Sequence, residues 1–119
     1  MIERMKAAFE AGNMDELAQD VYWVASSTNT SDTMEVYEQV VRIDSKTNTQ
    51  TFTATLPNVS AARGKIYVIT GTLCTGYAIT LQDNDDDAGL TNITLDADGE
   101  YVVLYSDGRM WYELCTGYS

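Results

Sequence analysis

Carboxylates are the only side chains in this sequence whose number and spacing could support chemistry on their own. Asp83, Asp85 and Asp87 stand at alternate positions of an acidic run, as the oxygen ligands of a calcium loop do. The glycine of the run comes one position later than in such a loop, and Thr94 stands where the loop would need a glutamate. We therefore favour a solvated loop between two strands, and cation binding by these three residues is the alternative.

The sequence lacks the catalytic groups that most enzyme classes use. The sequence contains no histidine, which removes the commonest general base and metal ligand. It also has no phosphate-binding glycine loop, dinucleotide fingerprint or nucleophile elbow. Eighteen Asp and Glu residues could still hold an acid/base pair, so a carboxylate hydrolase is the least favoured alternative. We expect a protein that is not an enzyme and that needs no cofactor or metal.

The two cysteines lie in a short internal repeat. Residues 73–77 (LCTGY) recur as residues 114–118 (LCTGY), an offset of 115 − 74 = 41 positions. If the two segments are equivalent or neighbouring, Cys74 and Cys115 could form a disulfide outside the reducing cytoplasm. The other interpretation, which we favour, is two free thiols in similar turns.

Size and charge indicate one acidic globular domain. The chain has 119 residues, 45% of them apolar, and a net charge of −11, so it is too apolar for a disordered protein and repels a phosphate backbone. It contains no apolar run long enough to span a bilayer and no secretion signal at its start. We expect synthesis in the host cytoplasm, with neither nucleic acid nor membrane as a partner.

Residues 1–25 are predicted to form a helical arm. Ile2, Met5 and Phe9 recur at helical spacing, and Gly12 follows as a helix terminator. A second short helix is predicted to present an apolar face of Met14, Leu17, Ala18 and Val21. Helices this short must dock against another surface. Residues 26–35 are polar and without periodicity, and we interpret them as a linker.

Residues 36–119 are predicted to form the β domain, because apolar residues recur there at a period of two. Strands at 36–43 and 51–56 are expected to form a hairpin around a turn at 44–48. Further strands are expected at 65–70, 77–82, 90–95, 100–105 and 110–114. Seven short strands indicate an antiparallel β-sandwich, or a β-prism built between chains.

Specific roles can be predicted for residues in and after these strands. Leu56 is expected in the core, and Pro57 ends its strand because it has no N–H. A hairpin turn is expected at residues 106–108, with Gly108 at positive φ, so that Tyr105 and Trp111 return toward one another. For Trp111 we favour packing in the core or a subunit interface over ligand stacking.

Two stretches carry a resemblance to a known family. Residues 53–57 (TATLP) with 61–69 (AARGKIYVI), and residues 98–112 (DGEYVVLYSDGRMWY), resemble the signatures of a small β domain of bacteriophage fibres and particle-decorating proteins. The match runs from about residue 36 to residue 114. The resemblance implies an intertwined homotrimer in the virion. The residues assigned to its core or trimer interface are Leu56, Tyr67, Tyr101 and Trp111.

The expected function is therefore structural. The sequence opens on its own Met1 and has no extended shaft, which favours a capsid decoration or cement protein over a tail fibre. Its partners are then other copies of itself and the major capsid protein, on the outer surface of the capsid. Ile2, Met5 and Phe9 are the candidate contacts with the capsid or a neighbouring subunit. The alternative is a carbohydrate-binding adhesion module on a head or tail fibre, which binds host-surface glycans through exposed Tyr and Trp rings.

Overall fold

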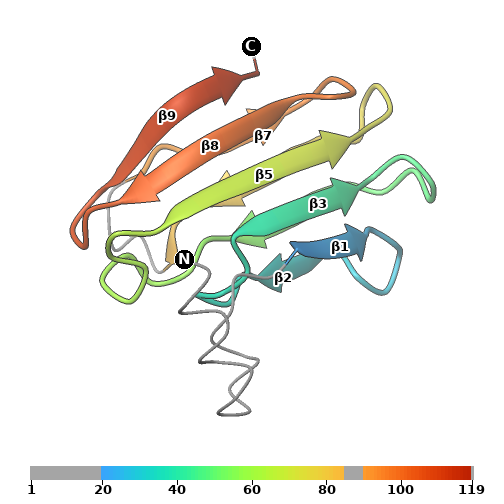
Figure 1. The fold of residues 1–119 in the computed structure, drawn as a ribbon. Helices are drawn as coiled ribbons and strands as arrows, with labels where there is room; N and C mark the ends of the chain where they lie inside the picture. The colour runs from blue at the N-terminus through green and yellow to red at the C-terminus, as the bar shows by residue number, and fades with distance from the viewer. Residues whose placement is uncertain (1–19, 85–89, 119) are drawn as a thin grey trace.

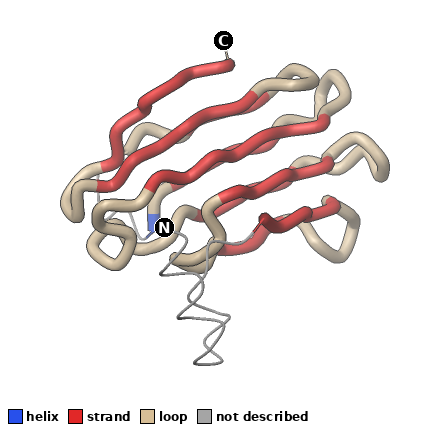
Figure 2. Tube along the Cα trace, viewed as in Figure 1, coloured by secondary structure: helices blue, strands red, loops and turns tan. Residues whose placement is uncertain are grey.

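The chain folds into two β-sheets that face one another across a shared core (Figure 1). The computed structural model describes residues 20–84 and 90–118. Strands and the loops that join them make up nearly all of this part of the chain (Figure 2), so the mainly β prediction is confirmed. Ile2, Met5 and Phe9, with the first predicted helix, lie outside the described residues, as do Asp85 and Asp87.

Five strands form the larger sheet, in the order β1-β3-β5-β8-β9. They are β1 (Asp20–Val24), β3 (Val40–Asp44), β5 (Ile66–Thr72), β8 (Tyr101–Ser106) and β9 (Trp111–Gly117). The smaller sheet has the order β2-β4-β6-β7. Its strands are β2 (Ser31–Thr33), β4 (Phe52–Thr55), β6 (Ile79–Gln82) and β7 (Ile93–Leu95). In Figure 1 the five-stranded sheet lies in front.

Both sheets are mixed, and the prediction of a wholly antiparallel sandwich is wrong. From β1 to β6 the chain enters the two sheets alternately, so β1, β3 and β5 run parallel to one another, as do β2, β4 and β6. Antiparallel pairs come only afterwards, where β7 returns beside β6 and where β8 and β9 close the larger sheet. A period of two tells which side of a sheet a residue faces, but not which way the neighbouring strand runs.

The predicted hairpin between residues 36–43 and 51–56 is wrong for the same reason. Its two strands exist, but β3 belongs to the larger sheet and β4 to the smaller one. The turn between them is an arch that carries the chain across the core. Ser45, at its start, is buried and donates its hydroxyl to the Tyr77 carbonyl (2.8 Å).

The predicted second helix is contradicted where it reaches the described residues. Val21 lies in β1, which pairs with β3 along its whole length. Trp23 of the same strand packs across the sandwich against Phe52, with ring centroids 5.7 Å apart. The polar segment interpreted as a linker also contains a strand, β2, which is short and exposed.

The core lies between the sheets and is built from the inward side chains of both. Tyr67 and Trp111 form its largest aromatic contact, at 5.5 Å between centroids. The Tyr67 hydroxyl reaches the Val36 carbonyl (2.6 Å), whereas the Trp111 indole N–H has no acceptor among the described residues. Leu56 is fully buried just after β4 ends. Leu56, Tyr67 and Trp111 therefore pack within one copy of the chain.

The backbone of the turn between β8 and β9 has the predicted conformation, but the side chains beside it do not have the predicted directions. Gly108 has a φ of +95°, as predicted. Tyr105 is paired with Tyr112, however, and Trp111 with Ser106. Because successive residues of a strand face opposite sides, Tyr105 points outward and Trp111 inward. The prediction that Tyr105 and Trp111 approach one another is wrong.

Candidate interaction surface

The outer side of the five-stranded sheet is lined with apolar and aromatic side chains. Strand register aligns Val40, Val68 and Val103 in one row across the sheet. A second row runs through Tyr22, Arg42, Thr70 and Tyr101, and a third contains Ile66, Tyr105 and Tyr112. We call this surface the outer face, defined by Tyr22, Val40, Ile66, Val68, Tyr101, Val103, Tyr105 and Tyr112.

Several of these side chains are open to water. Tyr22 is 53% exposed, Ile66 47% and Tyr112 44%, values that belong to surface and not to core residues. Their inward neighbours in the same strands, such as Tyr67 and Leu104, are fully buried. The larger sheet is therefore apolar on both sides, whereas a sheet with one face in water normally alternates apolar and polar residues.

The outer side of the four-stranded sheet has the opposite chemistry. One row across it consists of Ser31, Thr53, Thr80 and Thr94, and a second consists of Thr33, Thr55 and Gln82. All of these are partly or fully exposed, and their hydroxyl and amide groups are suited to contact with water. The two outer sides of the sandwich thus differ. The described residues of the larger sheet present an apolar surface, and those of the smaller sheet present a polar one.

The few charges on the outer face are locally balanced. Arg42 pairs with Asp20 (3.0 Å), and its guanidinium lies 5.3 Å from the centre of the Tyr22 ring, which is a cation–π distance. The Tyr22 hydroxyl donates to Asp44 (2.8 Å), and this bond raises the pKa of Tyr22. Asp20 and Asp44 against Arg42 leave this side of the sheet with one net negative charge, although the whole chain carries −11.

Asp44 anchors one edge of this surface and starts the arch into the other sheet. One carboxylate oxygen accepts the amides of Lys46 (2.8 Å) and Thr47 (2.9 Å), and the other accepts the Tyr22 and Thr47 hydroxyls. Burial of Asp44 disfavours its charge, but the bonds from Thr47, Tyr22 and Lys46 outweigh that effect and lower the pKa to about 2.

Tyr101 sits over the C-terminal end of β9. It pairs with Gly117, and a Cβ at Gly117 would overlap the Tyr101 ring. The ring therefore lies close against the glycine backbone, and its hydroxyl is 3.8 Å from the Cys115 sulfur. This contact raises the pKa of Tyr101. Glycine at position 117 thus lets Tyr101 form part of a flat aromatic surface.

The residues predicted for the core or trimer interface do not gather at one place. Leu56, Tyr67 and Trp111 are buried between the sheets, and only Tyr101 belongs to the outer face. Tyr22, Tyr105 and Tyr112 were not predicted from the sequence to be interface residues. Spacing of two or four residues within a strand puts side chains on one side, and Tyr101 and Tyr105 have that spacing.

The two copies of the LCTGY repeat have different structures. Cys74 lies in a turn after β5, and Cys115 lies within β9. Cys115 stands in the same row as Val68 but two strands away, about 10 Å. Cys74 lies beyond the end of β5, where Thr72 is already about 13 Å along the strand from Val68. Such a separation is too long for a disulfide within the chain, and both thiols are free.

Neither a metal centre nor a membrane span is found in the part of the chain that the structure describes. No three potential ligands from His, Cys, Asp and Glu come together there. Asp83, the one described member of the candidate calcium loop, is buried and accepts the Leu90 amide (2.9 Å). Between residues 20 and 84, and between 90 and 118, no helix has the length and apolar character to cross a bilayer.

Comparison of the chain with protein-family models, with curated proteins and with solved structures gives no match.

Proposed function

We propose that this chain is a structural protein of a bacteriophage particle, a capsid decoration or cement protein that works as a homotrimer on the outer capsid surface. The observation that supports the proposal is the apolar outer face of the five-stranded sheet. Its location on one side of the sandwich only is the pattern expected when that side is covered in the working assembly.

The size of the outer face suits a specific contact. Five strands about 4.8 Å apart, each contributing about five residues of about 3.3 Å, cover roughly 400 Å². Apolar patches of about 300–600 Å² are the largest that ordinary monomers expose, and they are often functional. Tyrosine is also enriched in the cores of protein interfaces.

The charge distribution favours another copy of the chain as the partner that covers the outer face. Two copies that each carry −11 repel one another over most of their surfaces. On the outer face, Arg42 neutralises Asp20, and Asp44 at its edge is the other charged group, bonded to Tyr22. Copies can therefore meet there without bringing like charges together, and burial of Val68, Val103 and the tyrosines would drive association.

The resemblance to phage decoration domains supplies the remaining parts of the proposal. Attachment to the major capsid protein is assigned to Ile2, Met5 and Phe9, whose helical spacing suits a groove on a partner. A protein that binds the assembled shell but not free subunits stabilises the shell by mass action. Three attachment segments in one trimer let weak single contacts add up.

Binding to undecorated capsids tests the proposal. Purified protein is mixed with capsids, and the pellet is assayed after sedimentation and imaged by electron microscopy. We expect saturable binding by the full chain, and loss of binding with an intact trimer when residues 1–12 are deleted. Absence of the full chain from the capsid pellet would contradict the decoration role, and binding by the deletion variant would contradict the assignment of the attachment segment.

A carbohydrate-binding adhesion module is the second candidate, because four tyrosines lie on the outer face. The rings of Tyr105 and Tyr112 are 6.5 Å apart and inclined by 32°, close to the offset arrangement of a flat aromatic platform. Apolar faces of sugar rings can stack on such a platform. Binding to a glycan array without any affinity for capsids would favour this function.

A further inference from the structure

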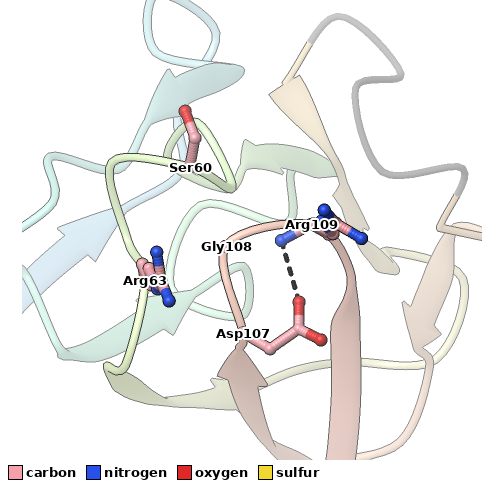
Figure 3. A pocket seen from close by; sticks show the side chains of 5 residues that line it. All are labelled: Ser60, Arg63, Asp107, Gly108 and Arg109. Atoms are coloured by element: carbon pink, nitrogen blue, oxygen red, sulfur yellow. Dashed lines mark hydrogen bonds between the residues drawn. The ribbon is translucent and has the colours of Figure 1, made fainter.

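Cations are scarce in this protein, and two that form no ion pair within the described residues lie together. Of the Lys and Arg residues that the structure describes, Arg42 pairs with Asp20 (3.0 Å) and Lys46 with Asp98 (3.9 Å). Arg63, Lys65 and Arg109 form no ion pair with any described carboxylate. Arg63 and Arg109 line the same surface hollow (Figure 3).

The hollow is formed by two segments that are far apart in sequence. It has a volume of about 460 Å³ and is lined by Ser60, Arg63, Asp107, Gly108 and Arg109. The segment before β5 is tied to the β8–β9 turn by the Gly64 amide, which donates to the Ser106 carbonyl (2.8 Å), and by the buried Ser106 hydroxyl, which donates to the Val59 carbonyl (2.7 Å). The site is therefore held by contacts that do not involve the arginine side chains.

The one acidic residue of the hollow is occupied by its own turn. One oxygen of Asp107 accepts the amides of Arg109 (2.8 Å) and Met110 (2.9 Å), and the other accepts the Tyr112 hydroxyl (3.2 Å). The bonds from Met110 and Arg109 lower the pKa of Asp107. Asp107 stays ionised, so the hollow carries two positive charges and one negative charge. Figure 3 shows its carboxylate bonded to the backbone amide of Arg109.

Glycine at position 108 leaves room for the side chain of Arg63 to pack against the turn. A Cβ at Gly108 would lie 3.0 Å from both Cγ and Cδ of Arg63 and 3.3 Å from its Cβ. The aliphatic stem of Arg63 therefore packs directly on the turn. This contact restricts one of the two guanidinium groups before any ligand arrives, which reduces the entropy that binding must overcome.

We propose that Arg63 and Arg109 form a binding site for an oxyanion group, either free or carried on a saccharide. Guanidinium presents parallel N–H donors that match the oxygens of sulfate, phosphate or carboxylate. In a chain that otherwise repels anions, two unpaired arginines beside a hollow provide the local attraction that such a ligand needs. The site is at the β8–β9 turn and does not depend on the capsid role or on the trimer.

The test is a titration of ¹⁵N-labelled full-length protein with sodium sulfate at constant ionic strength, with sodium chloride as the reference. We expect saturable NMR shifts at the Gly108 and Arg109 amides and at the arginine Nε–H groups. Arg63→Gln and Arg109→Gln should each weaken sulfate binding by about tenfold, because each removes one positive charge and the parallel N–H donors that a guanidinium offers an oxyanion. The double variant should show no saturable shift.

Arg42→Gln is the matched control, because it removes an arginine that is already paired with Asp20. It should change sulfate affinity less than about twofold. A sulfated disaccharide that binds tighter than sulfate would identify a sugar-borne group, and equal affinities would identify the free anion. Shifts equal to those with chloride, or retained in the double variant, would overturn the proposal, and unchanged thermal unfolding of the variants would exclude misfolding as the cause.

Discussion

At the scale of single residues, Asp44 supports both the outer face and the arch between the sheets. It is 4% exposed and accepts four hydrogen bonds. Asp44→Asn should lower the free energy of unfolding at pH 7 by about 1–2 kcal/mol, because an amide cannot accept all four bonds and brings an N–H₂ group without a partner. Urea unfolding measures the change.

Asp44 should also make the stability of the fold depend on pH. The folded pKa of about 2 lies below the usual aspartate value of 3.8, so the charged form stabilises the fold above about pH 4 and this stability is lost as the pH falls toward 2. Asp44→Asn should remove this part of the acid sensitivity. Asp32→Asn, in an exposed strand, is the control. Parallel pH curves for Asp44→Asn and the unmodified chain would contradict the assignment.

Alanine substitutions at two glycines with the same backbone conformation distinguish the cost of backbone strain from the cost of a steric clash. Gly99 and Gly108 have φ of +84° and +95°, but only Gly108 has heavy atoms within 4 Å of an added Cβ. Gly99→Ala should cost about 1–2 kcal/mol from the left-handed backbone alone. Gly108→Ala should cost more and should also weaken sulfate binding, because it displaces Arg63. Thermal unfolding and the sulfate titration measure both effects, and identical behaviour of the two variants would argue against the packing role.

At the scale of elements, the sequence located most strands but, apart from the β8–β9 hairpin, not their partners. The strands from β5 to β9 lie within about three residues of the predicted ranges, because alternation and turn residues are local signals. The strand β1 was missed because Val21 follows residues with helical spacing. Strand direction was missed because neighbours in each sheet come from different turns of the chain, as when Val40 pairs with Val68.

The outer face could not be predicted from the sequence either, because it depends on which strands are neighbours in the sheet. Val40, Val68 and Val103 form one row only because β3, β5 and β8 are adjacent in the sheet. Alternation alone showed that each valine shares a side with its i+2 neighbour, without showing which side faces water. The hollow at Arg63 and Arg109 likewise requires a loop and a turn more than 40 residues apart to meet.

The strand order also predicts where the fold is most stable. The strand β5 has β3 on one side and β8 on the other, whereas β1 stands at the edge of the sheet. Amides of β5 should therefore exchange with solvent most slowly, through global unfolding, and those of β1 faster, through local opening. Hydrogen exchange followed by mass spectrometry measures this order. Slower exchange in β1 than in β5 would contradict the strand order.

At the scale of the whole molecule, one sandwich carries two unlike surfaces. The hydroxyl rows of the smaller sheet need no cover, while the outer face of the larger sheet leaves valines, an isoleucine and tyrosines in water. Net charge of −11 keeps copies apart elsewhere. The proposed assembly through the outer face would account for the low charge of this surface in an acidic chain.

Val68 and Thr80 allow a matched test of this assembly. Both are half-buried, both point outward, and each lies in a strand with neighbours on both sides, Val68 in the larger sheet and Thr80 in the smaller one. A lysine at either position extends into water in a single copy, because its long stem can carry the charge outward. Only at position 68 would that charge be buried in the proposed trimer.

Sedimentation velocity of the full-length protein and these two variants is the deciding measurement. The unmodified chain and Thr80→Lys should sediment as trimers of three times 13.2 kDa, about 40 kDa, and Val68→Lys as a monomer of 13.2 kDa. An unmodified chain that remains a monomer at micromolar concentration, or a Val68→Lys variant that still forms the trimer, would contradict assembly through the outer face.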